Sequence, residues 1–156
     1  PNQATLVGLL IARWSLAEFS LLMPVIRATG VTQEVAAALL ATTTSAGTKI
    51  DVTLSIVSAS ALPKNEKDDI IRSIKTLKKL VEQRNIVAHH LWAVSSDGET
   101  HTIDKRKLDN DPARMKRGSE DDLKALINQT VHAAHEICRS SGSPWIDETA
   151  VKALML

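Results

Sequence analysis

The clearest periodic pattern in the chain lies between Pro63 and Trp92. At about 100° per residue, a single helical face carries Ile70, Ile74, Leu77, Val81, Ala88 and Trp92. Asn65 is placed to cap this helix, with an acidic residue three positions later, and we expect the helix to extend to about Leu91. Arg84 falls near the middle of the apolar face, where a charged side chain needs a partner or hydrogen bonds.

Two further helices are expected before this one. The first covers about residues 5–28, is kinked or shortened by Pro24, and is almost encircled by apolar side chains. That pattern indicates burial on more than one side and, in a chain this small, contact with a second subunit. The second covers about residues 33–60. Its middle, residues 42–47, is rich in Thr, Ser and Gly, which permits close helix packing or a bend, and we favour close packing.

The pattern changes after the central helix. Alternating residues around Asp97-Gly98 predict a small β-hairpin, and a polar loop follows it. Ser119 then caps a helix that runs to about Arg139. Its apolar face consists of Leu123, Leu126, Ile127, Val131, Ala134, Ile137 and Cys138. The tail, about residues 143–156, holds one short helix that either docks on the bundle or reaches a partner.

Together these elements predict one all-α domain spanning residues 1–156. We expect an antiparallel bundle of four main helices, with a small β-hairpin after the third and a short C-terminal helix. The hairpin and a basic loop occupy about residues 93–118. A chain of 156 residues with 44% apolar and 24% charged residues is long enough to bury one core.

Composition narrows the setting of the protein. The single cysteine, Cys138, rules out an internal disulfide framework and indicates a reducing compartment, which we take to be the cytoplasm. Residues 6–26 are apolar, but Arg13, Glu18 and Pro24 interrupt them and no signal-peptide pattern surrounds them, so we expect no membrane association. A net charge of +1 means that any nucleic-acid site must come from a local cluster of cations.

The clearest such cluster is the basic loop between His101 and Arg117, which holds six Lys or Arg residues against three Asp. Its cations are Lys105, Arg106, Lys107, Arg114, Lys116 and Arg117. The loop either holds the phosphates of a nucleic acid or is an ordinary solvated loop.

Arg84, Asn85 and His89 are the candidate reactive group. Arginine presents a planar fork to phosphate oxygens, and histidine can act as general acid or base near neutral pH. Metal-free cleavage of RNA needs a base for the 2′-OH, an acid for the leaving oxygen and a cation for the phosphorane. Positions five apart lie about 140° apart around an ideal helix, so two copies of the motif at a two-fold axis would assemble a site better than one. His90 is a weaker candidate for substrate contact.

The run Arg84-Asn85-Ile86-Val87-Ala88-His89, at the end of a long helix, resembles the Arg-polar-x3-His signature of the HEPN superfamily. Many members of that superfamily are metal-independent ribonucleases that act as dimers with a shared site. The resemblance implies that His89 is the general acid/base, that Arg84 stabilises phosphate and that Asn85 orients the site, with no cofactor. It also implies 2′,3′-cyclic phosphate and 5′-hydroxyl products, a toxin or defence role, and an antitoxin as a candidate protein partner.

The main alternative is a non-catalytic helical module for dimerisation or protein interaction. In that reading Arg84 is a buried cation paired with an acid from an earlier helix, and Glu18 and Asp51 are the candidate acids. The same acids could orient Arg84 in a ribonuclease. Nucleotide binding without cleavage is a third, weaker reading.

A metal site is not expected. His132, His135 and Cys138 form an H-x-x-H-x-x-C run, but on a helix His132 points away from the apolar face and Cys138 points into it. The chain contains no Gly-rich phosphate loop, nucleophile elbow or dinucleotide fingerprint, which argues against ATPase, esterase and oxidoreductase functions.

Overall fold

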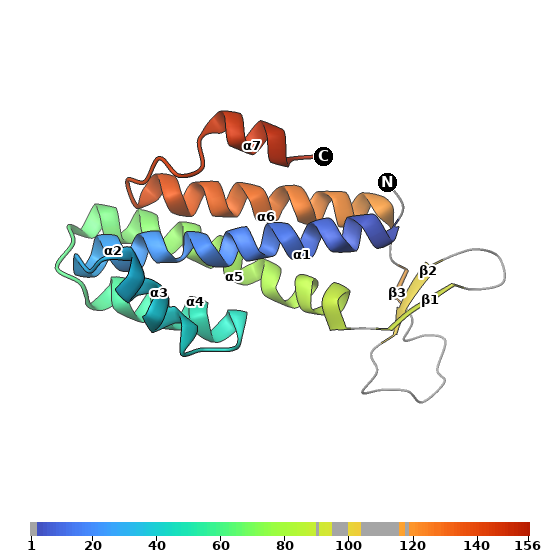
Figure 1. The fold of residues 1–156 in the computed structure, drawn as a ribbon, viewed down its shortest axis with the longest axis horizontal. Helices are drawn as coiled ribbons and strands as arrows, with labels where there is room; N and C mark the ends of the chain where they lie inside the picture. Colours follow the sequence, from blue (N-terminus) through green and yellow to red (C-terminus); the bar gives the residue numbers. More distant parts are fainter. Residues whose placement is uncertain (1–2, 90, 95–99, 104–115, 118) are drawn as a thin grey trace.

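The computed structural model describes residues 3–89, 91–94, 100–103, 116–117 and 119–156, with the backbone alone for His89 and for the strands. The described part is all-α apart from a small sheet, and its class agrees with the prediction (Figure 1). The helices are α1 (Gln3–Ser20), α2 (Leu22–Thr29), α3 (Gln33–Ala41), α4 (Ala46–Ala59), α5 (Lys64–His89), α6 (Glu120–Ser140) and α7 (Glu148–Leu154).

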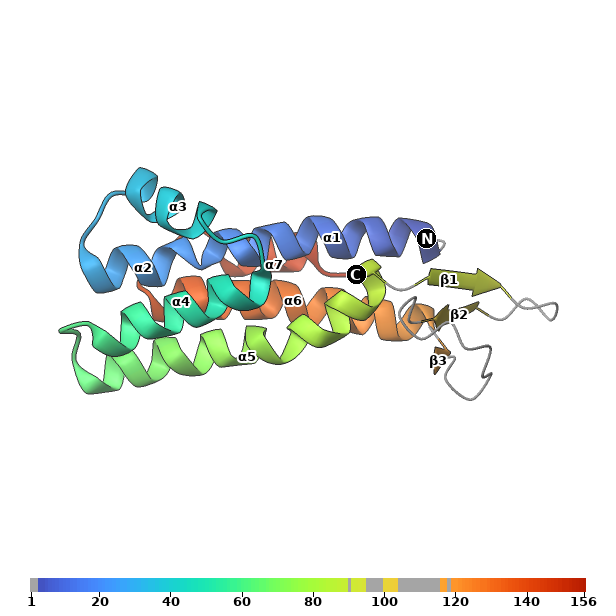
Figure 2. The same cartoon turned by 90° about the horizontal axis from the view of Figure 1, so that it is seen from below.

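The long helices α1, α5 and α6 form the body of the molecule. Helix α6 packs against both α1 and α5, and α4 packs along α5 (Figures 1 and 2). The apolar face predicted for α6 is confirmed, since all seven of its residues are buried. On α5, Ile70, Ile74 and Leu77 are fully buried, and Leu10 of α1 meets them in the same core.

The first expected helix is interrupted near Pro24, as predicted, and the interruption divides it into the two helices α1 and α2. The break falls at Leu21, between α1 and α2. Pro24 explains its position, because proline has no N–H to donate to the carbonyl of Ser20 and its ring crowds that carbonyl. The Ser20 hydroxyl turns back to donate to the Ala17 carbonyl at 2.7 Å.

The second expected helix is also two helices, and the close packing favoured for residues 42–47 is wrong. The hydroxyls of Thr42 and Thr43 donate to the carbonyls that end α3, at 2.7 and 3.0 Å. Ser45 then caps α4 by accepting from the Thr48 N–H at 3.4 Å. These side chains compete with the helical hydrogen bonds, so the chain turns here instead of continuing.

The ends of α5 also differ from the prediction. The helix begins at Lys64, directly after Pro63, so Asn65 lies inside the first turn and is not the cap. It ends at His89 rather than Leu91, and Trp92 belongs to a strand instead of the helical face. At the start of α6 the predicted cap is confirmed, because Ser119 accepts from the Asp122 N–H at 3.0 Å.

A three-stranded antiparallel sheet lies at the end of the bundle, where α5 ends and α6 begins (Figures 1 and 2). Its strands are β1 (Leu91–Val94), β2 (Thr100–Ile103) and β3 (Lys116–Arg117). Leu91 pairs with Ile103, and His101 pairs with Arg117. The expected turn at Asp97-Gly98 lies outside the described residues.

The tail docks on the bundle. Helix α7 lies along α6, and the side chain of Asn128 accepts from the Leu156 N–H at 2.9 Å and donates to its carbonyl at 3.2 Å (Figure 1). Arg13 of α1 donates to the Leu154 carbonyl at 3.3 Å. Before α7, the Trp145 ring lies 5.0 Å from the Phe19 ring, centroid to centroid. Much of the apolar surface of α1 is therefore covered by its own chain.

One stretch of the described chain, Gln3–Thr29, is long and apolar enough to cross a membrane. It comprises α1 and α2, which the break at Leu21 separates. In its most apolar window, 44% of the residues are buried inside the fold, where α1 contacts α6 and α2 contacts α4.

Candidate functional site: a guanidinium on the face of Trp14

The Arg84 side chain lies over an aromatic ring. Its guanidinium carbon is 5.5 Å from the centroid of Trp14, which is 1% exposed and belongs to the core face of α1. This is the geometry of a cation–π contact, worth about 0.5–2 kcal/mol depending on desolvation. The ring therefore gives the half-buried cation a partner that leaves its charge unneutralised.

Trp14 is itself fixed by a carboxylate. Its indole N–H donates to Glu18 Oε1 at 2.9 Å, one helical turn along α1. The other oxygen, Glu18 Oε2, accepts from Lys49 Nζ of α4 at 2.6 Å. A carboxylate on the indole N–H polarises the ring toward greater negative charge, which favours a cation on its face. We call Lys49, Glu18, Trp14 and Arg84 the Trp14 relay.

The rest of the motif surrounds Arg84. Nη1 of Arg84 donates to Asn85 Oδ1 at 3.1 Å, so the predicted pair is brought together. Nε of Arg84 is buried and has no hydrogen-bond partner among the described residues. His89 is the last residue of α5 and follows in the next turn, and its side chain lies outside the described part. A guanidinium with a buried, unused N–H retains capacity to donate to an added oxygen ligand.

Neither candidate acid pairs directly with Arg84. Glu18 is taken by Trp14 and Lys49, and Asp51 pairs with Lys78 Nζ at 2.6 Å on the surface of α4 and α5. Among the described residues, no carboxylate forms an ion pair with Arg84. Glu18 supports Arg84 only through the ring of Trp14, an indirect arrangement that the sequence analysis did not foresee.

Most of the candidate substrate-binding residues lie outside the described part of the structure. His90, Lys105, Arg106, Lys107 and Arg114 fall outside the described residues. Lys116 and Arg117 form β3, whose backbone pairs with β2 near the end of α5. Residues 104–115 of the predicted basic loop lie outside the described part, and the strands on either side of them, β2 and β3, lie beyond the C-terminal end of α5 (Figure 2).

Trp14 and Lys49 are functional candidates that sequence reasoning missed. The spacing Trp14-x3-Glu18 places an indole and a carboxylate on one face of a helix and could have predicted their hydrogen bond. No comparable signal places that ring beneath Arg84, because the contact joins residues seventy positions apart.

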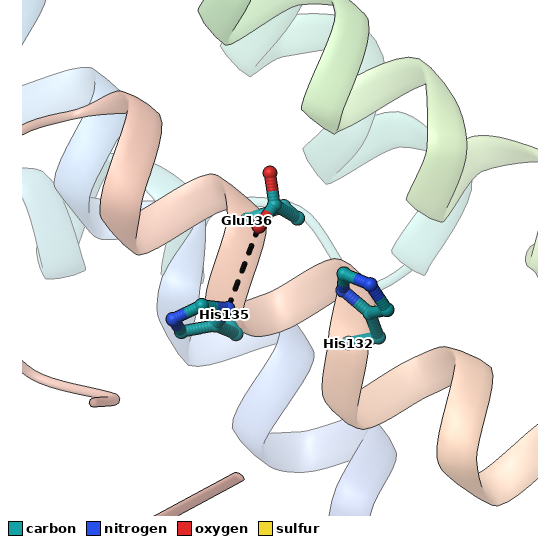
Figure 3. A group of neighbouring side chains, drawn as sticks. All are labelled: His132, His135 and Glu136. Atoms are coloured by element: carbon teal, nitrogen blue, oxygen red, sulfur yellow. Dashed lines mark ion pairs between the residues drawn. The ribbon is translucent and has the colours of Figure 1, made fainter. Parts of the chain in front are cut away.

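A second polar group lies on α6. Figure 3 shows His132, His135 and Glu136, whose ligand atoms all lie within 4.8 Å of one another. His135 Nδ1 is 3.5 Å from Glu136 Oε1. The hydrogen bond from Arg139, 2.8 Å between Nη2 and Oε2, is the main cause that holds the pKa of Glu136 below its usual range. His132 and Glu136 line a groove of about 390 Å³ between α5 and α6.

Cys138 does not belong to that group. It is 1% exposed and packs in the core, and burial raises the pKa of its thiol to about 11. The H-x-x-H-x-x-C run is thus divided as predicted between the exposed His132 and the buried Cys138.

Comparisons of this chain with protein-family models, with curated protein sequences and with solved structures give no significant match. The function of the protein is therefore inferred from the geometry of its own residues.

The geometry around Arg84 predicts a modest loss of stability on its removal. Replacement Arg84→Met removes the cation–π contact and one hydrogen bond but, among the described residues, leaves no carboxylate without its partner. We expect a loss of about 1–2 kcal/mol in the free energy of unfolding, measured by urea denaturation. Arg72→Met, at an exposed position of the same helix, should change it by less than about 0.5 kcal/mol. A loss of about 3–5 kcal/mol for Arg84→Met would indicate a broken buried ion pair and contradict this geometry.

The surroundings of Cys138 predict an unreactive thiol. A pKa of about 11 leaves about 0.1% of a thiol ionised at pH 8, and burial blocks access to it. We expect the folded protein to react with a disulfide reagent at least about 100-fold more slowly than the protein in denaturant. Comparable rates in the two states would show that Cys138 is exposed and ionised.

Proposed function

We propose that this protein is a HEPN-like, metal-independent endoribonuclease that acts in the cytoplasm. Arg84 stabilises the phosphate in the transition state, His89 serves as general acid/base and Asn85 orients Arg84. The observation that carries the proposal is the state of Arg84: a half-buried guanidinium held by Trp14 and Asn85, with no acid neutralising it among the described residues.

This state of Arg84 favours catalysis over the structural module. A cation that serves only to fix helix packing is usually neutralised by a carboxylate when it is buried. Both acids that could have done this are engaged with lysines instead. A positive charge kept in place by a rigid ring suits a group that must meet phosphate, because a preorganised cation stabilises a transition state without rearrangement.

The site needs a second copy of the chain. Arg84 and His89 diverge by about 140° around an ideal helix, so two copies meeting at a two-fold axis would supply two of each to one groove. Large exposed side chains on α1 and α3, namely Ile11, Val35 and Leu39, support a homodimer, since such residues are candidates for burial in an interface. The basic loop would hold RNA beside the groove.

The alternative is a non-catalytic dimerisation or protein-interaction module. The exposed apolar residues of α1 and α3 are equally consistent with this module, because they could form its interface. The module assigns no function to the positive charge of Arg84. The ribonuclease proposal, and not this alternative, includes a role as a toxin or defence nuclease with an antitoxin as partner.

The proposal predicts cleavage of a labelled, mixed RNA by the protein in excess EDTA. Arg84→Met and His89→Ala should each reduce the rate at least about 100-fold, the usual loss when a general acid/base or a preorganised charge is removed. Arg72→Met and His132→Ala are matched controls at exposed positions and should retain the parent rate. Absence of cleavage by a folded parent protein would favour the interaction module, and cleavage that survives in both variants would place the activity elsewhere.

The shared groove predicts complementation between two inactive variants. Refolding Arg84→Met and His89→Ala chains together should form heterodimers that hold one intact Arg84 and one intact His89 in the groove. We expect the mixture to regain a fraction of the activity that neither variant shows alone. A dimeric parent by light scattering, with no regain in the mixture, would mean that each subunit acts by itself.

A further inference from the structure

The group on α6 has the spacing of a metal-binding helix face. His132, His135 and Glu136 stand at positions i, i+3 and i+4, which are neighbours on the surface of an α-helix. Their ligand atoms lie within 4.8 Å of one another (Figure 3). The group shares no residue with the Trp14 relay.

The donor types are those that a transition metal selects. Two imidazoles and one carboxylate form a ligand set typical of Zn²⁺ sites that keep a position open. Metal–ligand bonds of about 2.0–2.2 Å place tetrahedral donors about 3.3–3.6 Å apart. His135 Nδ1 and Glu136 Oε1 already lie 3.5 Å apart. To complete the site, mainly the exposed His132 side chain would have to rotate toward them. Within the described part of the chain, His132 makes no hydrogen bond that would oppose this rotation.

The carboxylate of Glu136 already forms an ion pair with a competing cation, Arg139. Arg139 donates to both of its oxygens, with Nη2–Oε2 at 2.8 Å and Nε–Oε1 at 3.2 Å. The Arg139 side chain is 63% exposed and can swing into solvent at little cost. A divalent ion would replace its single charge with two, and its attraction would extend to both histidines.

We propose that His132, His135 and Glu136 bind a divalent transition-metal ion of the Zn²⁺ class, with Arg139 occupying the carboxylate when the ion is absent. The three protein ligands leave a coordination position for water or a small ligand. His132 and Glu136 both line the groove between α5 and α6, so that position is accessible from the groove. Cys138 is not a ligand, because it packs in the core.

The test is a titration of the full chain, freed of metal by a chelator and dialysed, with Zn²⁺ followed by calorimetry. Co²⁺ replaces Zn²⁺ in a parallel titration, and its visible absorption reports nitrogen and oxygen coordination. We expect a stoichiometry of one ion per chain. His132→Ala, His135→Ala and Glu136→Gln should each weaken binding by at least about 10–100-fold, as removal of a ligand costs no less than removal of a residue that supports one. Glu120→Gln, at an exposed carboxylate of the same helix, is the matched control and should bind as the parent does.

Removal of the competing Arg139 should strengthen Zn²⁺ binding, whereas removal of a ligand should weaken it. Arg139→Gln frees Glu136 and should tighten Zn²⁺ binding by about two- to fivefold, whereas Lys124→Gln, which frees Glu120 on the same helix, should leave it unchanged. Equal affinity in the parent, His132→Ala and His135→Ala proteins would overturn the proposal, as would a stoichiometry of zero. RNA cleavage in EDTA is measured without the ion, so the outcomes for the two proposals are independent.

Discussion

The contact between Arg84 and Trp14 is the interaction on which the candidate site depends. A guanidinium near a core must be compensated, and here the compensation comes from the face of an indole rather than from a carboxylate. Glu18 fixes the ring and Lys49 balances Glu18, so three helices, α1, α4 and α5, cooperate to hold one positive charge. Because the ring is rigid and fully packed, it fixes the position of the cation, and no carboxylate among the described residues neutralises the charge.

The packing of α1, α4, α5 and α6 provides this contact. Helices α1 and α5 each pack on α6, and that brings Trp14 within reach of the last turns of α5. The break at Leu21, forced by Pro24, lets α2 and α3 leave the axis of α1, and α4 then returns along α5 with Lys49 aimed at Glu18. The small sheet begins at Leu91, two residues after His89, and its strand β3, with Lys116 and Arg117, lies at the same end of the molecule.

Hydrophobic periodicity predicts the all-α class and the helices α5 and α6, and residue type predicts the cap at Ser119, because each depends on residues close in sequence. It failed where side chains compete with the helical backbone, as Thr42, Thr43 and Ser45 do, since local hydrogen bonds there outweigh continued helix. The candidate residues Arg84 and Asn85 could be chosen from the motif alone. Their support by Trp14 and Lys49 could not, because it depends on how separate helices pack.

In the proposed ribonuclease, Arg84 and His89 promote attack of a 2′-OH on the adjacent phosphate of RNA. The most direct measurement is the chemistry of the cut ends produced by the parent protein in EDTA, read by mass spectrometry. Attack by the 2′-OH leaves a 2′,3′-cyclic phosphate and a 5′-hydroxyl, and these are the ends that we expect. Ends bearing a 3′-hydroxyl and a 5′-phosphate would show attack by water at the phosphate and would contradict it.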